Sequence, residues 1–346
     1  MEKGKVHIFL CGEYRANAGP SNVNRYLLTR SKNQLSCVKS ENILLKRLER
    51  YWRLLFSDVT VFSGYGYYVG FAIRILRLLH KKSVYLMHGC VAYENHINEL
   101  GISSKIIQKE DYILHNVDLI LCVSEQYMKW VVQRFPELKD RAYYLNSGID
   151  DKEYENINLL RDESDEKVIK IVAAGGDRNQ KNNLEICKAV EKIAGSTDKA
   201  IMFDIFGRCY AAHNVFSDYL HTRYRGMVPK EELYQALHSS KVFVLNSEIE
   251  SFGLAIVDAL MCGCSVLVTQ NAGICSLLSL QESDIIYNVH ATDEIAKKID
   301  YVIEHPNNKR LINSIDFDNC SWKSISERLY AICACLQSGQ DYTSIR

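Results

Sequence analysis

Proline is rare in this sequence, with four residues in 346, and no segment is built from a few repeated residue types. Long linkers and extended tails are usually rich in proline or low in complexity, so neither is expected. No internal repeat at solenoid spacing is present. With 47% apolar and 24% charged residues, the chain is expected to form about two globular domains.

Long hydrophobic runs are also missing. The apolar run at residues 6–11 is too short for the core of a signal peptide or for a membrane span. No other segment approaches the roughly 18 apolar residues that a spanning helix needs. We therefore interpret residues 6–10 of this run as a first strand and expect a cytoplasmic protein.

The twelve cysteines contain no Cys-x-x-Cys pair. Cys262 and Cys264, like Cys333 and Cys335, are too closely spaced for a zinc knuckle. Free, mostly buried thiols in a reducing compartment are the simpler interpretation, and no metal site is expected.

The formal net charge is zero, but the charges are unevenly distributed. Residues 1–82 hold 15 Lys+Arg and 5 Asp+Glu, and the remainder holds 27 and 37. The basic segments 39–56 and 71–82 also have apolar faces, which suits helices packed on a sheet and equally peripheral attachment to an anionic membrane on its cytoplasmic side. No nucleic-acid recognition motif accompanies them, so no nucleic-acid partner is expected.

Strand-like and helix-like segments alternate along the chain, and the strands are nearly continuous apolar runs. This pattern predicts two doubly wound, Rossmann-like domains with parallel sheets facing a cleft. We place the first domain at 1–155 and the second at 167–320, with the polar run 151–166 as the junction. A last helix within 321–346 follows a complete second domain and can cross back to the first. The strands are expected at 6–10, 58–62, 83–89, 119–124, 142–146, 168–176, 200–207, 224–228, 241–246 and 265–270.

The stretch from Ser247 to Val266 carries the main functional signal. A helix that begins near Gly253, after a strand, offers unpaired N–H groups and a positive dipole to a phosphate. Glu250 precedes this helix and can accept hydrogen bonds from hydroxyl groups. Asp258 lies among apolar residues and needs donors, which either ribose hydroxyls or an internal N–H group would supply. Phosphate, ribose and a second polyol in one crevice describe a nucleotide sugar.

These residues resemble a known family motif. Glu250, the Phe252-Gly253 pair and Asp258 resemble the E-x7-E motif of the retaining glycosyltransferases of family 4, the glycosyl transferases group 1, which have the GT-B fold. Other segments extend the resemblance over nearly the whole chain: 18–27, 86–89, 116–131, 145–150, 173–183, 224–253 and 317–332. The sequence departs from the family at Asp258, usually Glu, at Ser265, commonly Pro, and at Ser147, commonly Asn.

The resemblance implies a role for each matching residue. Arg178 and Lys181 would stabilise the charge of the departing diphosphate, Glu250 would hold donor-sugar hydroxyls, and His88 would contact the donor sugar. Without the family context, His88 is equally a strand-capping histidine, and the two cations are solvated loop residues. The implied substrate-binding residues are Gly19 and Asn22, in the loop after the first strand, and Gly175, Met227, Val228, Phe252, Gly253, Leu254 and Asp258.

The resemblance also implies a reaction. The enzyme would move a hexosyl or N-acetylhexosaminyl group, with retention and without a metal or other cofactor, from a nucleotide-diphosphate sugar, with UDP favoured. The acceptor would be a glycan, free or linked to a polyprenyl diphosphate, in the synthesis of a surface polysaccharide such as capsule or lipopolysaccharide.

Other interpretations stay open. Gly64, Gly66 and Gly70 imitate a dinucleotide fingerprint, but the next strand ends at His88 where an oxidoreductase needs an acid. Asp316-x-Asp318 imitates a metal-binding motif, although we expect a loop there. The same fold could also serve an epimerase or hydrolase, or a non-catalytic partner subunit.

Overall fold

The computed structural model describes residues 6–16, 19–32, 34–149, 168–196, 198–211 and 213–345. The chain divides into two compact units, Met1–Ile149 with Asp318–Arg346, and Asp150–Phe317. The expected junction at 151–166 lies outside the described residues. Within the described ranges, no helix is both long enough and apolar enough to cross a bilayer.

The first unit is built on a six-stranded parallel sheet in the order β2-β1-β3-β4-β5-β6. Its strands are almost entirely buried, as expected when helices cover both faces. The strand bounds are β1 Ile8–Gly12, β2 Leu35–Ser36, β3 Val59–Ser63, β4 Lys82–Met87, β5 Leu119–Cys122 and β6 Ala142–Tyr144. The helix bounds are α1 Gly19–Arg30, α2 Ile43–Phe56, α3 Val69–Leu78, α4 Val91–Asn98, α5 Ser104–Asn116, α6 Glu125–Arg134 and α13 Trp322–Ser338.

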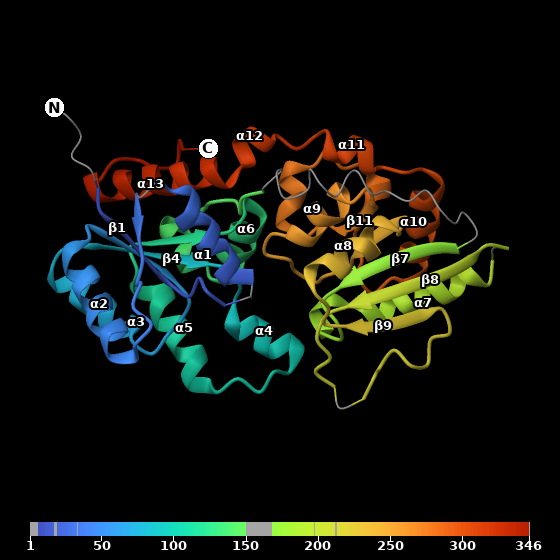
Figure 1. Cartoon of the computed structure of the whole chain (residues 1–346), viewed down its shortest axis with the longest axis horizontal. Coiled ribbons are helices and arrows are strands. Elements are labelled where there is room, and N and C mark those ends of the chain that lie inside the picture. The colour runs from blue at the N-terminus through green and yellow to red at the C-terminus, as the bar shows by residue number, and fades with distance from the viewer. Residues whose placement is uncertain are drawn as a thin grey trace. The chain divides into compact units, whose positions relative to one another are not determined.

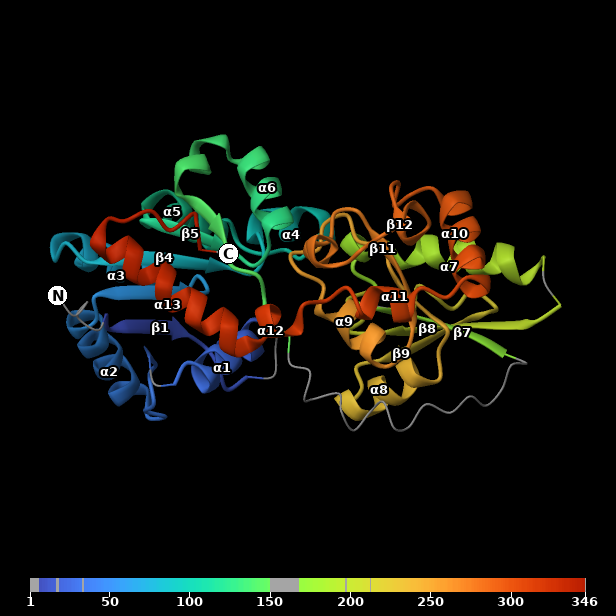
Figure 2. The same ribbon diagram turned by 90° about the horizontal axis from the view of Figure 1, so that it is seen from above.

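The last helix, α13, packs against α1 of the first unit, and the two lie side by side in Figures 1 and 2. The Trp322 ring stacks on Tyr26 with ring centroids 5.0 Å apart. The buried Ser326 hydroxyl donates to the carbonyl of Leu27 at 2.8 Å. A Cβ atom on Gly148 would lie 2.4 Å from the Trp322 ring, so only glycine fits at this crossing point.

The second unit has its own parallel sheet in the order β12-β11-β10-β7-β8-β9. This is the strand order of a doubly wound dinucleotide-binding domain, with the reversal between β7 and β10. The two parallel sheets confirm the predicted fold class. The strands are β7 Val168–Ala174, β8 Ala200–Phe206, β9 Thr222–Gly226, β10 Val242–Leu245, β11 Ser265–Thr269 and β12 Ile285–Ile286. The helices are α7 Asn183–Ala194, α8 Lys230–His238, α9 Leu254–Met261, α10 Thr292–Glu304 and α11 Asn308–Ile312.

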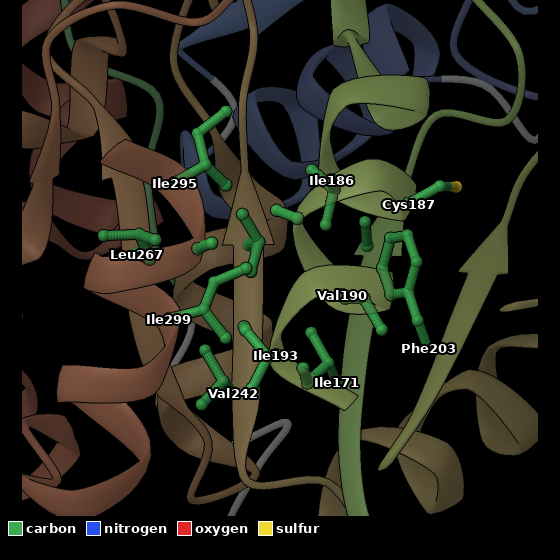
Figure 3. Packing of buried hydrophobic residues seen from close by; sticks show 14 of the residues in the cluster. Ile171, Ile186, Cys187, Val190, Ile193, Phe203, Val242, Leu267, Ile295 and Ile299 are labelled. Atoms are coloured by element: carbon green, nitrogen blue, oxygen red, sulfur yellow. The ribbon is translucent and has the colours of Figure 1, made fainter. Parts of the chain in front are cut away.

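The core of this second unit lies between its sheet and helices α7 and α10 (Figure 3). On α7, Ile186, Val190 and Ile193 follow the i, i+4, i+7 spacing that gathers apolar side chains on one helix face. They pack with Ile295 and Ile299 of α10 in one buried cluster. This packing holds α7 and α10 against the sheet, and loops follow the strands at the edge of that sheet.

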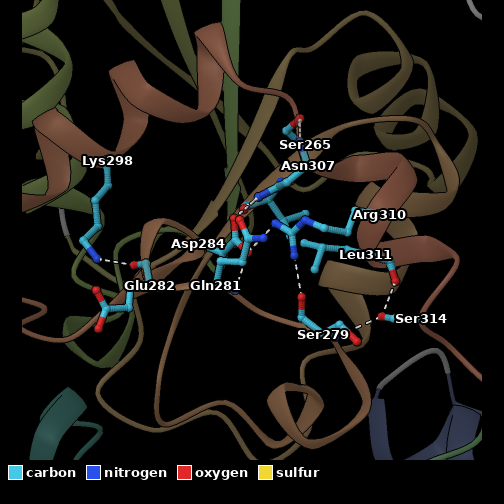
Figure 4. Close-up of polar contacts among 11 residues, drawn as sticks. Ser265, Ser279, Gln281, Glu282, Asp284, Lys298, Asn307, Arg310, Leu311 and Ser314 are labelled. Atoms are coloured by element: carbon cyan, nitrogen blue, oxygen red, sulfur yellow. Dashed lines mark hydrogen bonds and ion pairs between the residues drawn. The ribbon is translucent and has the colours of Figure 1, made fainter.

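A buried polar cluster joins the last part of this unit to its sheet (Figure 4). Asp284 is 1% exposed and accepts hydrogen bonds from Arg310 at 2.6 Å and from Asn307 at 2.8 Å. Asn307 also donates to the carbonyl of Val266 on β11 and accepts from its N–H group. The Asp284 carboxylate therefore helps to connect α11 to the sheet, because Arg310 and Asn307 bond to it and Asn307 also bonds to β11.

Several elements differ from the sequence-based expectations. The strands β2 and β12 have two residues each, too few to show a pattern, and α4, α10 and α11 were not predicted. The Asp316-x-Asp318 segment is not wholly a loop, because the short helix α12, Phe317–Cys320, includes Asp318. Gly19 and Asn22 are not in a loop either. They lie in the first turn of α1, with Pro20 next to Gly19.

We predict that Asp284→Ala lowers the melting temperature by roughly 6–12 °C, because Arg310 and Asn307 lose their buried acceptor, a loss of about 3 kcal/mol. Calorimetry on the full chain measures this shift. The neighbouring exposed acid provides the control, since Glu282→Ala should change the melting temperature by less than about 2 °C. Equal shifts for the two variants would contradict the assignment.

Candidate functional site

The candidate site lies at the carboxyl ends of β7 and β10, where the strand order of the second sheet reverses. These strands are neighbours, with Val242 paired to Ile171, although β8 and β9 separate them in the chain. Their following loops also contact each other: the Glu248 N–H donates to the carbonyl of Gln180 at 2.9 Å, and the Gln180 side chain donates to the carbonyl of Ile249 at 2.7 Å. A reversal point of this kind is where open α/β sheets bind their ligands.

Two of the predicted residues form an ion pair across these loops. Lys181 Nζ donates to Glu250 Oε2, with side chains only 16% and 18% exposed. The Glu250 backbone is held as well, since its N–H donates to Asn271 at 3.2 Å and its carbonyl accepts from Gly273 at 3.0 Å. The sequence suggested separate roles for Lys181 and Glu250, and the structure brings the two groups into contact.

Glycine at 175 allows Lys181 to reach this position. Gly175 has φ of 108°, and a Cβ atom there would lie 2.6 Å from Lys181 Cγ. The N–H groups of Gly175 and Gly176 both donate to the carbonyl of Phe206, at 2.8 and 3.0 Å. The N–H group of Gly175 is already bonded within the protein. The role of this glycine is therefore to let the Lys181 side chain pass close to the backbone.

Arg178 is held beside Tyr210, a residue that sequence reasoning missed. Its guanidinium donates to the Tyr210 hydroxyl at 2.8 Å and lies 5.3 Å from the ring centroid. Asp177 anchors the Tyr210 loop by accepting from the N–H groups of Tyr210 and Ala211 at 2.7–2.9 Å. Burial opposes ionisation of Asp177, but these donors outweigh it and hold the pKa below its ordinary value. No motif in the sequence marked Tyr210.

Helix α9 begins at Leu254, four residues after Glu250, with Gly253 as its N-cap. Gly253 has φ of 104°, a left-handed conformation that favours glycine, and Phe252 is buried beside it. A Cβ atom on Gly253 would lie 3.4 Å from Glu250 Cγ, so the start of α9 is close to Glu250. A helix N-terminus beside a lysine suits an anionic group.

Asp258 was expected to need hydrogen-bond donors, and the structure gives it one within the protein. It is half-buried and accepts a hydrogen bond from the Tyr234 hydroxyl of α8 at 3.3 Å. Met227 and Val228 follow β9 at the far side of the same sheet edge, and Met227 is 72% exposed. All the site residues predicted in the second unit thus lie after strand ends or on α9.

The site residues predicted in the first unit are His88, Gly19 and Asn22. His88 directly follows β4, is half-buried, and its Nε2 atom lies 2.9 Å from the Ser63 hydroxyl at the end of β3. Burial lowers the pKa of His88 from 6.5 to about 4, so the ring is neutral at pH 7. Asn22 accepts from Arg25 on the same helix at 2.6 Å.

The arrangement of possible metal ligands can be given for residues 6–16, 19–32, 34–149, 168–196, 198–211 and 213–345. No group of three or more His, Cys, Asp or Glu side chains in those ranges could hold a metal ion.

Comparison with known proteins decides the family. Residues 158–314 match the family model described as glycosyl transferases group 1, which spans most of the second unit. The second unit therefore carries a group 1 glycosyltransferase domain. This confirms the family predicted from the motif around Glu250, and glycosyl transfer is accordingly the activity of the class.

Solved structures of GT-B glycosyltransferases share the fold of this chain at low sequence identity. Sucrose-phosphate synthase from Thermosynechococcus elongatus has a TM-score of 0.71 and 14% identity, over 97% of this chain and 100% of that one. The catalytic domain of starch synthase IV from Arabidopsis thaliana, bound to ADP and acarbose, has a TM-score of 0.69 and 12% identity, over 96% of this chain and 99% of that one. HepE from Anabaena, in complex with UDP and glucose, has a TM-score of 0.65 and 11% identity, over 94% of this chain and 98% of that one. No curated protein matches the sequence.

We predict that His88 makes the first unit less stable in acid. The unfolded chain binds a proton near pH 6.5 and the folded one only near pH 4, so stability is full above 6.5 and falls as the pH drops toward 4. Between pH 7 and 5 the wild type should lose roughly 1–2 kcal/mol more than His88→Gln, whose side chain does not titrate. Thermal unfolding at several pH values measures the difference, and parallel pH profiles would refute the prediction.

Proposed function

We propose that this group 1 glycosyltransferase transfers a hexosyl or N-acetylhexosaminyl group from a nucleoside diphosphate sugar, UDP-linked by preference, with retention of anomeric configuration. The acceptor is a glycan or polyprenyl-diphosphate-linked glycan of a surface polysaccharide. The observation that carries the proposal is the Lys181–Glu250 pair at the reversal point of the second sheet. In this proposal Lys181 binds the diphosphate and Glu250 binds hydroxyls of the sugar, and the contact between the two side chains supports a common site.

The diphosphate gains negative charge as the bond to the sugar breaks. Arg178 and Lys181 follow β7, and the α9 N-terminus follows β10, so positive charge converges from two neighbouring strands. Such fixed charge stabilises a departing oxyanion most strongly where water is largely excluded. In this proposal the protein's own cations perform that task, which a divalent metal performs in other transferases.

Glu250 has a second partner available when the donor binds. A diphosphate carries more charge than one carboxylate and competes with Glu250 for Lys181. The carboxylate then accepts hydrogen bonds from the hydroxyls of the donor sugar, and such charge-assisted bonds are strong and directional. Its anchored backbone limits the change to a side-chain movement.

The nucleoside is proposed to lie toward α9 and the loop after β9. Asp258 accepts from the ribose hydroxyls while keeping its bond from Tyr234, and Met227 and Val228 lie beside the base. The resemblance to HepE, whose structures contain UDP and UDP-glucose, favours UDP, and ADP in starch synthase IV makes ADP the second candidate.

Retention is proposed to follow from attack on the face that the diphosphate leaves. The bond between the anomeric carbon and the phosphate oxygen breaks, the acceptor oxygen forms the new bond to that carbon, and the acceptor proton passes to a phosphate oxygen. No side chain then has to act as a strong base. A neutral His88 can contact the donor sugar as a hydrogen-bonding partner.

We predict that Lys181 and Glu250 separate nucleotide binding from transfer. Lys181→Ala should weaken UDP binding by about 10- to 100-fold, through the loss of a charged hydrogen bond. Glu250→Gln should leave UDP binding equal or tighter, because Lys181 loses its competitor, yet reduce transfer by about 100- to 1,000-fold. Calorimetric titration and an activity assay measure the two effects. Lys188→Ala, which breaks an exposed ion pair on α7, is the matched control. The reverse pattern would contradict the assigned roles.

We further predict a product with the anomeric configuration of the donor, formed at the same rate with and without a chelator. Proton NMR of a reaction with a UDP-sugar and a lipid-linked or free glycan determines the configuration. An inverted product, or loss of activity with the chelator, would overturn the mechanism. Sugar released or epimerised without an acceptor would favour the hydrolase or epimerase. Binding of NAD instead of nucleoside diphosphates would favour the oxidoreductase.

A further inference from the structure

Helix α2 presents its apolar face to solvent. Its N-cap, Asn42, accepts from the N–H groups of Leu44 and Leu45, so the helix is well capped from its first turn. Only Leu54 among its residues is buried. The exposed fractions of the other large apolar residues are 70% for Ile43, 68% for Leu44, 56% for Leu45, 68% for Leu48, 63% for Trp52, 47% for Leu55 and 60% for Phe56.

The inward face of α2 explains this orientation. Lys46 pairs with Glu13 at 3.4 Å, and the Arg50 guanidinium lies 3.7 Å from the centroid of the Tyr68 ring. Both cations line a cavity of about 230 Å³ at the end of β1. Turning the apolar face inward would require removing these charged contacts, so the fold itself keeps the apolar residues outside.

Helix α3 extends the exposed apolar surface. Phe71 is 57% exposed and meets Tyr51 of α2 edge to face, with ring centroids 6.1 Å apart. Lys81, after α3, donates to the carbonyl of Leu55 at the end of α2 at 2.7 Å. The two helices are neighbours (Figure 1), and Leu78 and Leu79 at the end of α3 are also exposed.

Exposed cations accompany this surface. Arg47 lies on α2 and Arg74 and Arg77 on α3, and all three are exposed. They belong to a segment, residues 1–82, with ten more basic than acidic residues. A symmetric contact with a second copy would bring like charges together, whereas an anionic surface would neutralise them. The charge therefore favours an anionic partner with an apolar interior.

We propose that α2, with the adjoining residues of α3, inserts its apolar face into the interfacial layer of an anionic lipid bilayer. Leu44, Leu48, Trp52 and Phe56 enter the acyl boundary while the flanking arginines contact lipid phosphates. A helix of 14 residues is too short to span a bilayer and lies in the plane of its surface. The inference does not depend on the proposed function, because lipid binding requires neither donor nor acceptor.

Vesicle sedimentation tests the proposal with the full chain. Vesicles of phosphatidylcholine and phosphatidylglycerol in equal amounts should bind the protein at least about tenfold better than phosphatidylcholine alone. The double variant Leu48→Glu/Trp52→Glu should bind the mixed vesicles at least about 100-fold less, because it loses two inserting side chains. Leu220→Glu, at an 88% exposed leucine of the second unit, should bind like the wild type.

Tryptophan fluorescence locates the contact. Of the three tryptophans, Trp52 is 63% exposed, Trp130 is half-buried and Trp322 is buried, so insertion of Trp52 into mixed vesicles should shift the emission of the wild type to the blue. Trp52→Phe should still bind the vesicles but lose most of this shift.

Equal vesicle binding by wild type and double variant, or no binding at all, would overturn the proposal. So would a wild-type dimer, seen by sedimentation velocity, that the double variant dissociates without any vesicle binding. Unchanged melting temperatures for all variants ensure that lost binding does not reflect unfolding.

Discussion

The parallel pairing of β7 with β10 is the constraint on which the candidate site depends. It joins strands that β8 and β9 separate in the chain, and it brings their following loops to one point on the sheet edge. The contacts of Gln180 with Glu248 and Ile249 fix these loops against each other, and Lys181 then reaches Glu250. Neither loop alone holds both charges.

The sequence was informative where chemistry is local and less so where it depends on tertiary pairing. Apolar runs predicted the main strands, and the Gly253 turn predicted the start of α9, because both signals lie within a few residues. The contact of Lys181 with Glu250 could not be predicted, since it requires the strand order. The same holds for Tyr234 with Asp258 and Tyr210 with Arg178, 24 and 32 residues apart. The Gly19-Pro20 pair, by contrast, was an overlooked helix-start signal.

Helix α2 shows the limit of amphipathic patterns as predictors of packing. The sequence defines an apolar face and a charged face, but it cannot say which one meets the sheet. Here Glu13 and Tyr68 select the charged face by contacting Lys46 and Arg50. Polar contacts at the end of β1 occupy the inward side of α2, so its leucines remain exposed to solvent. The first unit therefore has a surface suited to an apolar partner.

The return of α13 to α1 has a consequence for how the chain folds during translation. The bond from Ser326 to Leu27 joins residues 299 positions apart, and Trp322 stacks on Tyr26. A ribosome delivers all of the second unit before this helix emerges. The second unit can therefore complete its core first, while the first unit waits with the outer side of α1 uncovered. Its maturation depends on residues that are synthesised after the second unit.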